Sequence, residues 1–318
     1  MNMKIATIET ALELPLVVEL DNLTAEQFAV YYEQNKDSIQ RRLHLNGAIK
    51  FRGVQVGSTD DFQALVDVVS TRVLNYIDGN SPRTKLTGNV YTSTEYDQTQ
   101  RITMHNELSY SAAWPKQLYF SCLIPSETGG ETLLADSRTI LERMNPEIVQ
   151  MVQTHGIKYI RNLHGGTGMG PSWQDTFETD DRRLVEKYCR VRKTEYEWRD
   201  NGSLRLVQFS PGVLQHEVTG ESVWFNQVDQ FHPSHLGEEL YEIMQAIYER
   251  PEDFPMYVEF GDGSPFPEDM IREILDTIDS VTVAPVWGRN EFLMIDNELV
   301  SHGRNPYTGN RKVLVAMS

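Results

Sequence analysis

The chain has 318 residues, of which 40% are hydrophobic and 10% aromatic, a composition typical of a globular protein with a substantial core. Its 46 acidic and 29 basic residues give a formal net charge of −17, so no general basic field exists to attract nucleic acid or an anionic membrane. The acidic balance does not exclude an anionic substrate, because a ligand responds to the charge inside its own pocket.

Nothing in the sequence predicts export or membrane insertion. Residues 1–20 contain no sustained apolar run followed by a small-residue cleavage site, so we expect no signal peptide. No window approaches the ~18 uninterrupted apolar residues of a membrane span. Two cysteines, Cys122 and Cys189, are too few for a disulfide framework. We therefore expect a cytoplasmic protein in a reducing compartment.

The first part of the chain predicts two helices around one strand. Thr24 and Gln27 have the spacing of a capping box, and the helix that they begin is expected to run to about Leu43, before Asn46-Gly47. Residues 48–51 alternate like a strand. An apolar stripe predicts a second helix over residues 60–77.

From Val90 onward, short alternating runs separated by turn residues indicate a β-sandwich or barrel. The expected strands are 117–124, 131–135, 203–209, 221–225, 291–295, 298–300 and 312–316, and the expected helical inserts are 146–154, 181–191, 235–250 and 267–279. Because no linker is visible, we predict one domain over residues 1–318. In it, residues 1–88 pack on a core formed by residues 89–318. The glycine-rich run 164–170 is either a lid over a pocket or a plain surface turn.

A metal site is the main chemical hypothesis. His105 and Glu107 are two residues apart, so on a strand their side chains point to the same face. A second histidine, His302, could complete a set of two imidazoles and one carboxylate, which holds Fe(II) and leaves positions open for other ligands. The spacing alone is a weak signal, because the chain contains 46 acidic residues and 8 histidines.

A co-substrate site would need further groups. A 2-oxo acid and O2 would fill the open metal positions, and a distal carboxylate would need an arginine and a hydroxyl donor. Arg311 offers the guanidinium, provided that strands 298–300 and 312–316 are antiparallel neighbours. Thr132, at the start of another strand, offers the hydroxyl. Trp224 and Asn226, alternating on one strand, could supply an apolar wall and an amide contact to a pocket, although core packing explains the tryptophan equally well.

Several segments together resemble a known family. They are Val90-Tyr91-Thr92-Ser93-Thr94-Glu95-Tyr96, Met104-His105-Asn106-Glu107-Leu108-Ser109-Tyr110, Gly129-Gly130-Glu131-Thr132 with Ala135-Asp136-Ser137-Arg138, Val223-Trp224-Phe225-Asn226-Gln227, and Ser301-His302-Gly303-Arg304-Asn305-Pro306-Tyr307 with Gly309-Asn310-Arg311. The chain resembles the Fe(II)/2-oxoglutarate-dependent oxygenases of the taurine dioxygenase (TauD/TfdA) family. It is most similar to the branch typified by the aspartate β-hydroxylase of syringomycin biosynthesis.

The resemblance implies a double-stranded β-helix core, a jelly roll of the cupin type, with helical inserts. It implies that His105, Glu107 and His302 bind iron, and that Arg311 and Thr132 bind the C5 carboxylate of 2-oxoglutarate. Some relatives place the co-substrate arginine farther beyond the second histidine. Here Arg304 is the other available arginine, and it could face the C1 carboxylate or the primary substrate.

The implied reaction couples decarboxylation of 2-oxoglutarate, giving succinate and CO2, to oxidation of an unactivated C–H bond. Because Glu107 keeps its carboxylate, halogenation is not expected. Hydroxylation is the first expectation, with desaturation or epoxidation open. The implied substrate is a small amino acid or amino-acid-derived group in specialised-metabolite biosynthesis, free or attached to a peptidyl carrier protein. A basic segment, residues 181–193, could dock an acidic carrier, although a solvated helix face explains it as well.

Two alternatives belong to other classes. A zinc hydrolase could use the same three metal-binding side chains without a 2-oxo acid. A metal-binding β-barrel without catalysis would keep the histidines but would need neither Arg311 nor Thr132. The presence of Arg311 at the start of the last strand favours the oxygenase over both alternatives.

Overall fold

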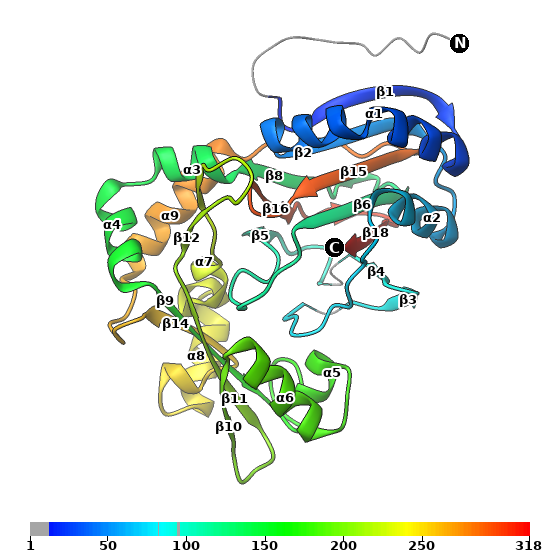
Figure 1. The fold of residues 1–318 in the computed structure, drawn as a ribbon. Helices are drawn as coiled ribbons and strands as arrows, with labels where there is room; N and C mark the ends of the chain where they lie inside the picture. The colour runs from blue at the N-terminus through cyan, green and yellow to red at the C-terminus, as the bar shows by residue number, and fades with distance from the viewer. Residues whose placement is uncertain (1–12, 82, 94–95) are drawn as a thin grey trace.

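The structure is a computed structural model that describes residues 13–81, 83–93 and 96–318. The stretch before residue 13, and Thr94 and Glu95 of the segment 90–96, lie outside these residues, so the structure says nothing of the sequence predictions made there. The described part is mainly β with helices around the sheets, as predicted (Figure 1). In this part of the chain, no helix combines the length and apolarity that crossing a membrane requires.

A seven-stranded sheet forms one wall of the core. Its order is β1-β2-β15-β6-β18-β4-β3, and its strands are β1 Leu16–Leu23, β2 Ala48–Val54, β15 Glu291–Asp296, β6 Gln117–Ile124, β18 Lys312–Met317, β4 Val90–Thr92 and β3 Lys85–Thr87. Its two central strands, β6 and β15, are long, almost wholly buried runs, as expected for strands covered on both faces.

A three-stranded sheet lies opposite the first. Its order is β5-β16-β8, with β5 Ile102–His105, β16 Val300–Arg304 and β8 Thr132–Asp136. The two sheets face each other closely, since the ring centroids of His302 on β16 and Phe120 on β6 are 5.5 Å apart. The space between these sheets is where side chains from distant parts of the chain can meet.

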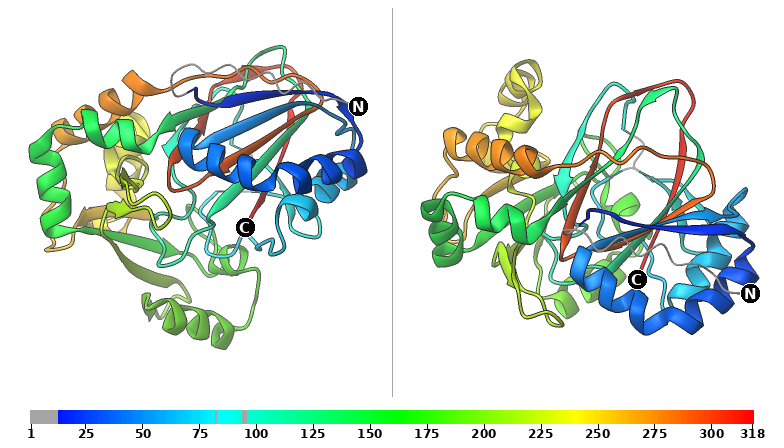
Figure 2. Two further views of the ribbon diagram at one scale, coloured as in Figure 1. Left: turned by 45° about the horizontal axis from the view of Figure 1, so that its top comes forward. Right: turned by 90° about the horizontal axis from the view of Figure 1, so that it is seen from above.

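Two N-terminal helices cover the outer face of the large sheet, as Figure 2 shows: α1 Ala25–Asn46 and α2 Thr59–Val69. The predicted capping box at Thr24 and Gln27 is present, and α1 ends at Gly47. Gly47 has φ +75°, and a Cβ there would lie 2.3 Å from Val300, so both backbone angle and space require glycine.

The second helix is shorter than predicted, which corrects the range 60–77. It ends at Val69, and the apolar stripe that continues through Val73 and Ile77 belongs to irregular chain and a turn. Leu74 N–H donates to the Met317 carbonyl instead of to a helical acceptor. The helical periodicity of the sequence continues beyond Val69, but a hydrogen bond to a distant strand holds this segment outside the helix.

The remaining elements surround the two sheets. A four-stranded sheet has the order β10-β11-β9-β14, with β10 Glu195–Trp198, β11 Leu204–Ser210, β9 Ile157–Leu163 and β14 Met256–Phe260. Two small ribbons pair β12 Val213–Gln215 with β13 Ser222–Trp224, and β17 Tyr307–Thr308 with β7 Thr128–Gly129. The helices are α3 Ser137–Arg143, α4 Pro146–His155, α5 Trp173–Phe177, α6 Arg182–Arg192, α7 Val228–Phe231, α8 Glu238–Ile247 and α9 Glu268–Val281, with 3₁₀ turns Pro233–Leu236 and Pro251–Asp253.

Two of the predicted ranges needed correction here. Residues 298–300 were expected to be a strand, but Glu298 and Leu299 form a turn and only Val300 belongs to a strand, as the first residue of β16. The Asp296 side chain holds the turn by accepting hydrogen bonds from the N–H groups of Glu298 and Leu299. The predicted helix 235–250 is a 3₁₀ turn followed by α8, since Gly237, with φ +74°, separates them.

Candidate metal centre and co-substrate cavity

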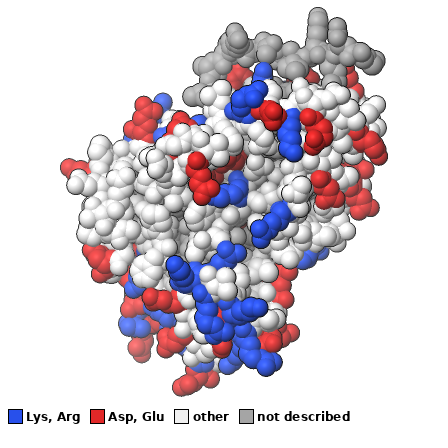
Figure 3. Space-filling model, viewed as in Figure 1, with Lys and Arg blue, Asp and Glu red and all other residues white. Residues whose placement is uncertain are grey.

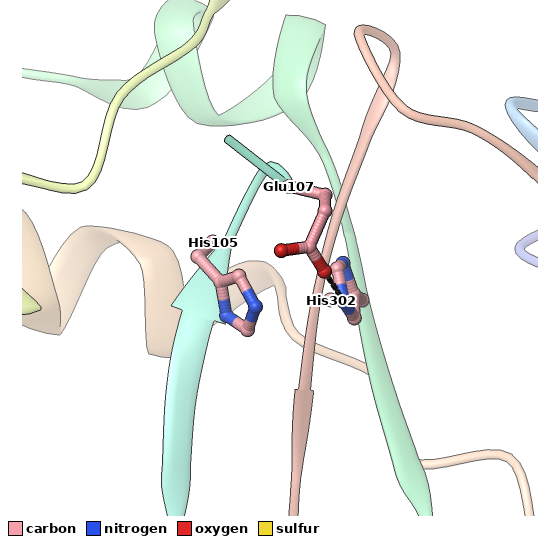
Figure 4. A group of neighbouring side chains, drawn as sticks. All are labelled: His105, Glu107 and His302. Atoms are coloured by element: carbon pink, nitrogen blue, oxygen red, sulfur yellow. Dashed lines mark ion pairs between the residues drawn. The ribbon is translucent and has the colours of Figure 1, made fainter. Parts of the chain in front are cut away.

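Three side chains meet between the two sheets (Figure 4). His105 is the last residue of β5, and it lies directly opposite His302 of β16 in the antiparallel register. Glu107 follows two residues later. The potential ligand atoms of the three residues all lie within 4.8 Å of one another, and Glu107 Oε2 is 3.8 Å from His302 Nε2. All three side chains are buried.

Strand alternation does not place Glu107, which corrects the argument from sequence. β5 ends at His105, so Glu107 lies in the chain beyond the strand. The Asn297 side chain holds it there, because its Oδ1 accepts from Glu107 N–H at 2.8 Å and its Nδ2 donates to the Glu107 carbonyl at 3.0 Å. Asn106 points away from the site, as expected, and donates to the Asn297 carbonyl.

The two imidazoles suit metal binding. His105 Nδ1 lies 2.9 Å from the Thr103 carbonyl and 3.1 Å from Gln230 Nε2, and these two contacts fix the orientation of the ring. Burial, reinforced by the neighbouring His105 and Arg83, lowers the pKa of His302 well below its usual value. His302 is therefore neutral at pH 7, and its Nδ1 has no hydrogen-bond partner among the described residues. Two imidazoles and a carboxylate are a donor set that fits Fe(II).

A small cavity of about 30 Å³ adjoins the triad. It contains both groups predicted for a distal carboxylate, Arg311 and Thr132. Arg311 Nε donates to the Gly130 carbonyl at 2.9 Å, and its Nη1 donates to Ser93 Oγ at 3.2 Å. Among the described residues no carboxylate forms an ion pair with Arg311. Burial and the nearby Arg304 lower the pKa of Arg311 to about 10, so it is still cationic at pH 7.

Thr132 is prepared to donate a hydrogen bond. Its Oγ1 accepts from the indole N–H of Trp287 at 2.9 Å, which leaves the hydroxyl proton for another acceptor. Trp287 and Asn297 are contributors that sequence reasoning missed. The Asp296-Asn297 pair was readable as a turn signal, but nothing local indicated which backbone its amide would hold.

We predicted that the strands next to His302 and Arg311 are antiparallel neighbours, and this prediction is wrong. The two residues nevertheless lie close together. β16 pairs with β5 and β8, whereas β18 pairs with β6 and β4. Arg311 and His302 line one cavity because they lie on the two facing sheets, not on neighbouring strands.

The other predicted contacts have different surroundings. Arg304 lines the small cavity, but its Nη2 donates to the carbonyls of Tyr96, Asp97 and Gln100. Trp224 is buried in the apolar core, and the Asn226 amide donates to the Gly212 carbonyl. Neither of these two residues lines the cavities beside the triad.

Two larger cavities lie on another side of the triad. One, of about 400 Å³, reaches His105 and Glu107, and the other, of about 670 Å³, extends to Gly170 and Pro171 at the end of the glycine-rich run. The residues lining both are Tyr76, Asn80, Ser81, Tyr96 and Met256. The end of this glycine-rich run therefore lines a cavity, and its role as a lid stays a prediction.

Comparison with known proteins agrees with this arrangement. A family model described as "Taurine catabolism dioxygenase TauD, TfdA family" matches residues 13–317. The chain belongs to this family. A clavaminate synthase-like protein of Arabidopsis thaliana is 32% identical over 312 residues, covering 94% of this chain and 90% of the relative. The dapdiamide synthesis protein DdaC of Enterobacter agglomerans is 32% identical over 279 residues, covering 88% and 84%.

Solved structures of TauD/TfdA proteins share the fold. AAD-2 in complex with Mn(II) and N-oxalylglycine superposes with a TM-score of 0.54 at 14% identity, over 100% of this chain and 97% of the other. A taurine dioxygenase from Burkholderia xenovorans gives a TM-score of 0.52 at 13% identity, over 95% and 85%. The predicted jelly-roll core is therefore confirmed. As a TauD/TfdA protein, the chain is an Fe(II)- and 2-oxoglutarate-dependent dioxygenase.

Proposed function

We propose that this dioxygenase hydroxylates an unactivated C–H bond of an amino acid or amino-acid-derived substrate, with desaturation or epoxidation as variants of the same chemistry. His105, Glu107 and His302 hold the iron in this proposal. The observation that carries it is the convergence of these three buried side chains, with ligand atoms within 4.8 Å, beside a cavity that contains an arginine without an acidic partner.

Each of the chain's own groups has a defined task. When bound, iron with 2-oxoglutarate and O2 supplies the oxidant for the C–H bond. Arg311 and Thr132 bind and orient the C5 carboxylate, because a guanidinium and a hydroxyl donor both line the small cavity. Asn297 fixes the Glu107 backbone, and Thr103 fixes the His105 ring, so the ligands are oriented before metal arrives.

An amino-acid-related substrate is supported by one relative and by the cavities. The relative DdaC is named for dapdiamide synthesis, which places that protein in a biosynthetic pathway. The cavity of about 400 Å³ next to His105 and Glu107 mixes the apolar Leu240 and Met256 with amide groups such as Gln227. Membership of the branch typified by the syringomycin aspartate β-hydroxylase is part of this proposal.

A carrier-bound substrate is a further element of the proposal. Exposed basic residues gather over α6, where Figure 3 shows a blue cluster near the bottom of the molecule; they include Arg182, Arg183, Lys187, Arg190 and Lys193. Leu184 and Val191, seven residues apart on the same helix, are 55% and 70% exposed. A basic surface with exposed apolar side chains fits an acidic carrier. α6 also packs on α5, which lines the larger cavity.

Two general expectations also remain proposals. A single oxygenase domain over residues 1–318 is supported by β1 and β2, which belong to the same sheet as β15, β6 and β18. A cytoplasmic location is supported by Cys122 and Cys189, which are both buried free thiols.

Anaerobic titration of the metal-free protein with Fe(II) and 2-oxoglutarate tests the proposed site. We expect a weak visible charge-transfer band in the wild type, and its loss in His302→Ala and Arg311→Gln. Arg272→Gln, on the exposed face of α9, is the matched control and should keep the band. No band in the wild type, together with tight Zn(II) binding, would contradict the oxygenase site and favour a hydrolase.

A further inference from the structure

A second buried arginine lies at the metal end of the small cavity. Arg83 precedes β3, and its side chain is only 2% exposed. Its Nη2 donates to Glu107 Oε2 at 2.6 Å, and its guanidinium lies 4.2 Å from the ring centroid of Tyr76. Its Nε and Nη1 are buried and have no hydrogen-bond partner within residues 13–81, 83–93 and 96–318. The proposed function does not use this residue.

The ion pair with Glu107 has a clear role without metal. A buried carboxylate needs a counter-ion, and Arg83 supplies it. A divalent cation bound by Glu107 would take over that role. The guanidinium would then face a cation of the same sign, with buried N–H groups that have no acceptor, a costly arrangement. Metal binding therefore creates a demand for another anion at Arg83.

The cavity indicates which anion meets this demand. Arg83 and Arg311 both line it, but they have separate surroundings: Arg83 contacts Glu107 and Tyr76, whereas Arg311 contacts Gly130 and Ser93. The histidines His105 and His302 lie on the same lining. Arg304 also lines the cavity, but its Nη2 donates to three backbone carbonyls, so Arg83 and Arg311 are the pair that matches a molecule with two carboxylates, such as 2-oxoglutarate.

We propose that Arg83 is a positioning residue that exchanges Glu107 for the C1 carboxylate of 2-oxoglutarate when metal binds. This inference rests on the proposed function, which assigns Glu107 to the metal and Arg311 to the C5 carboxylate. The exchange makes metal and co-substrate binding mutually favourable. Without co-substrate, Arg83 opposes metal binding; with it, Arg83 gains an anion. By linkage, each ligand tightens the binding of the other by the same factor.

Calorimetric titration with Mn(II) and N-oxalylglycine, an unreactive 2-oxoglutarate analogue, measures this coupling. Mn(II) is titrated with and without N-oxalylglycine, for wild type, Arg83→Gln, Arg83→Lys and the surface control Arg272→Gln. We expect Arg83→Gln to bind Mn(II) alone at least as tightly as wild type, and N-oxalylglycine at least about tenfold more weakly on the Mn(II)-loaded protein. Its coupling factor should fall correspondingly. Arg83→Lys, which keeps the charge but not the fork, should be intermediate.

The outcomes separate the possible roles of Arg83. Unchanged N-oxalylglycine affinity in folded Arg83→Gln would overturn the proposal, and would leave Arg83 as a partner of the primary substrate or of Glu107 alone. Weaker Mn(II) binding without a change in coupling would also overturn it and indicate that Arg83 merely supports Glu107. If Arg83→Gln does not fold, Arg83→Lys decides by the same comparison, because it keeps the counter-ion of Glu107. A wild type that binds neither ligand contradicts the proposed function itself.

Discussion

Two of the three arginines that line the small cavity, Arg311 and Arg83, differ in what holds them. Arg311 immediately precedes β18, a strand in the middle of the large sheet, and its hydrogen bonds go to a carbonyl and a hydroxyl. Arg83 lies in irregular chain and is already paired with a carboxylate. A buried guanidinium with neutral partners is ready for an anion at any time. A guanidinium already paired with a carboxylate becomes available only when that carboxylate moves away. Arg311 can therefore bind an anion at any time, whereas Arg83 can do so only after Glu107 has left it.

The largest effect is expected at the Arg311 end. Arg311→Gln removes the only cation proposed for the C5 carboxylate, and losing a buried charge-assisted partner costs about 2–5 kcal/mol. We expect the KM for 2-oxoglutarate to rise about 30-fold or more. Succinate formation measures it, with Arg272→Gln as control. Equal KM values in both variants would show that another cation binds this carboxylate.

A smaller effect is expected from the support of the metal end. Asn297→Ala removes both side-chain hydrogen bonds to the Glu107 backbone. Loss of a group that orients a metal ligand weakens metal binding about 10- to 100-fold. Mn(II) calorimetry should show this loss, whereas N-oxalylglycine affinity at saturating Mn(II) should change little. A change confined to the affinity for N-oxalylglycine would mean that Asn297 supports the Arg311 end of the cavity and not the metal end.

A smaller effect is expected from a substitution that weakens the support of Thr132 at the Arg311 end of the cavity. Trp287→Phe removes the indole N–H that donates to Thr132 Oγ1, and one neutral hydrogen bond contributes about 1 kcal/mol. We expect N-oxalylglycine binding to weaken about fivefold while Mn(II) binding is unchanged. Thr132→Val removes the whole hydroxyl, so this variant should bind N-oxalylglycine at least as weakly as Trp287→Phe. If Trp287→Phe alters metal binding instead, the indole stabilises the sheet rather than the hydroxyl.

The smallest expected effect concerns the turn that carries Asn297. A hydrogen bond to Asp296 raises the pKa of the buried His216, with a further contribution from Glu298. A raised folded-state pKa stabilises the fold fully at pH values below the unfolded pKa, and this stabilisation is lost as pH rises through the folded pKa. The free energy of unfolding should therefore fall slightly from pH 6 to pH 9, and His216→Gln should remove this part of the pH dependence. Urea denaturation at several pH values measures it.

Local signals in the sequence predicted local structure well. The capping box of α1, the glycine that ends it and the eight-residue strand β6 all follow from neighbouring residues. The spacing of His105 and Glu107 was a weak signal, and the resemblance to the TauD/TfdA family implied that both meet His302; the structure brings the three together. Prediction from local sequence failed where distant partners decide: α2 ends early because Leu74 finds the Met317 carbonyl.

The same limit explains the site residues that were missed. Asn297 acts on Glu107, which is 190 residues away along the chain, and Trp287 acts on Thr132 across 155 residues. Arg83 carries no motif spacing relative to the histidines. Such pairings depend on which faces of two sheets come together, and periodicity in a window of about 11–18 residues contains no information on that.

Arg304 both lines the small cavity and stabilises the backbone of a neighbouring segment. Two residues beyond His302, it ties the carbonyls of Tyr96, Asp97 and Gln100 to the strand that carries a metal ligand. Tyr96 is also part of the wall that the two larger cavities share. Replacing Arg304 would thus loosen the wall of the two larger cavities. It would also remove a positive charge from the small cavity. Because its Nη2 hydrogen bonds stabilise the backbone at Tyr96, Asp97 and Gln100, weaker ligand binding in Arg304→Ala would not by itself identify a residue that contacts a ligand.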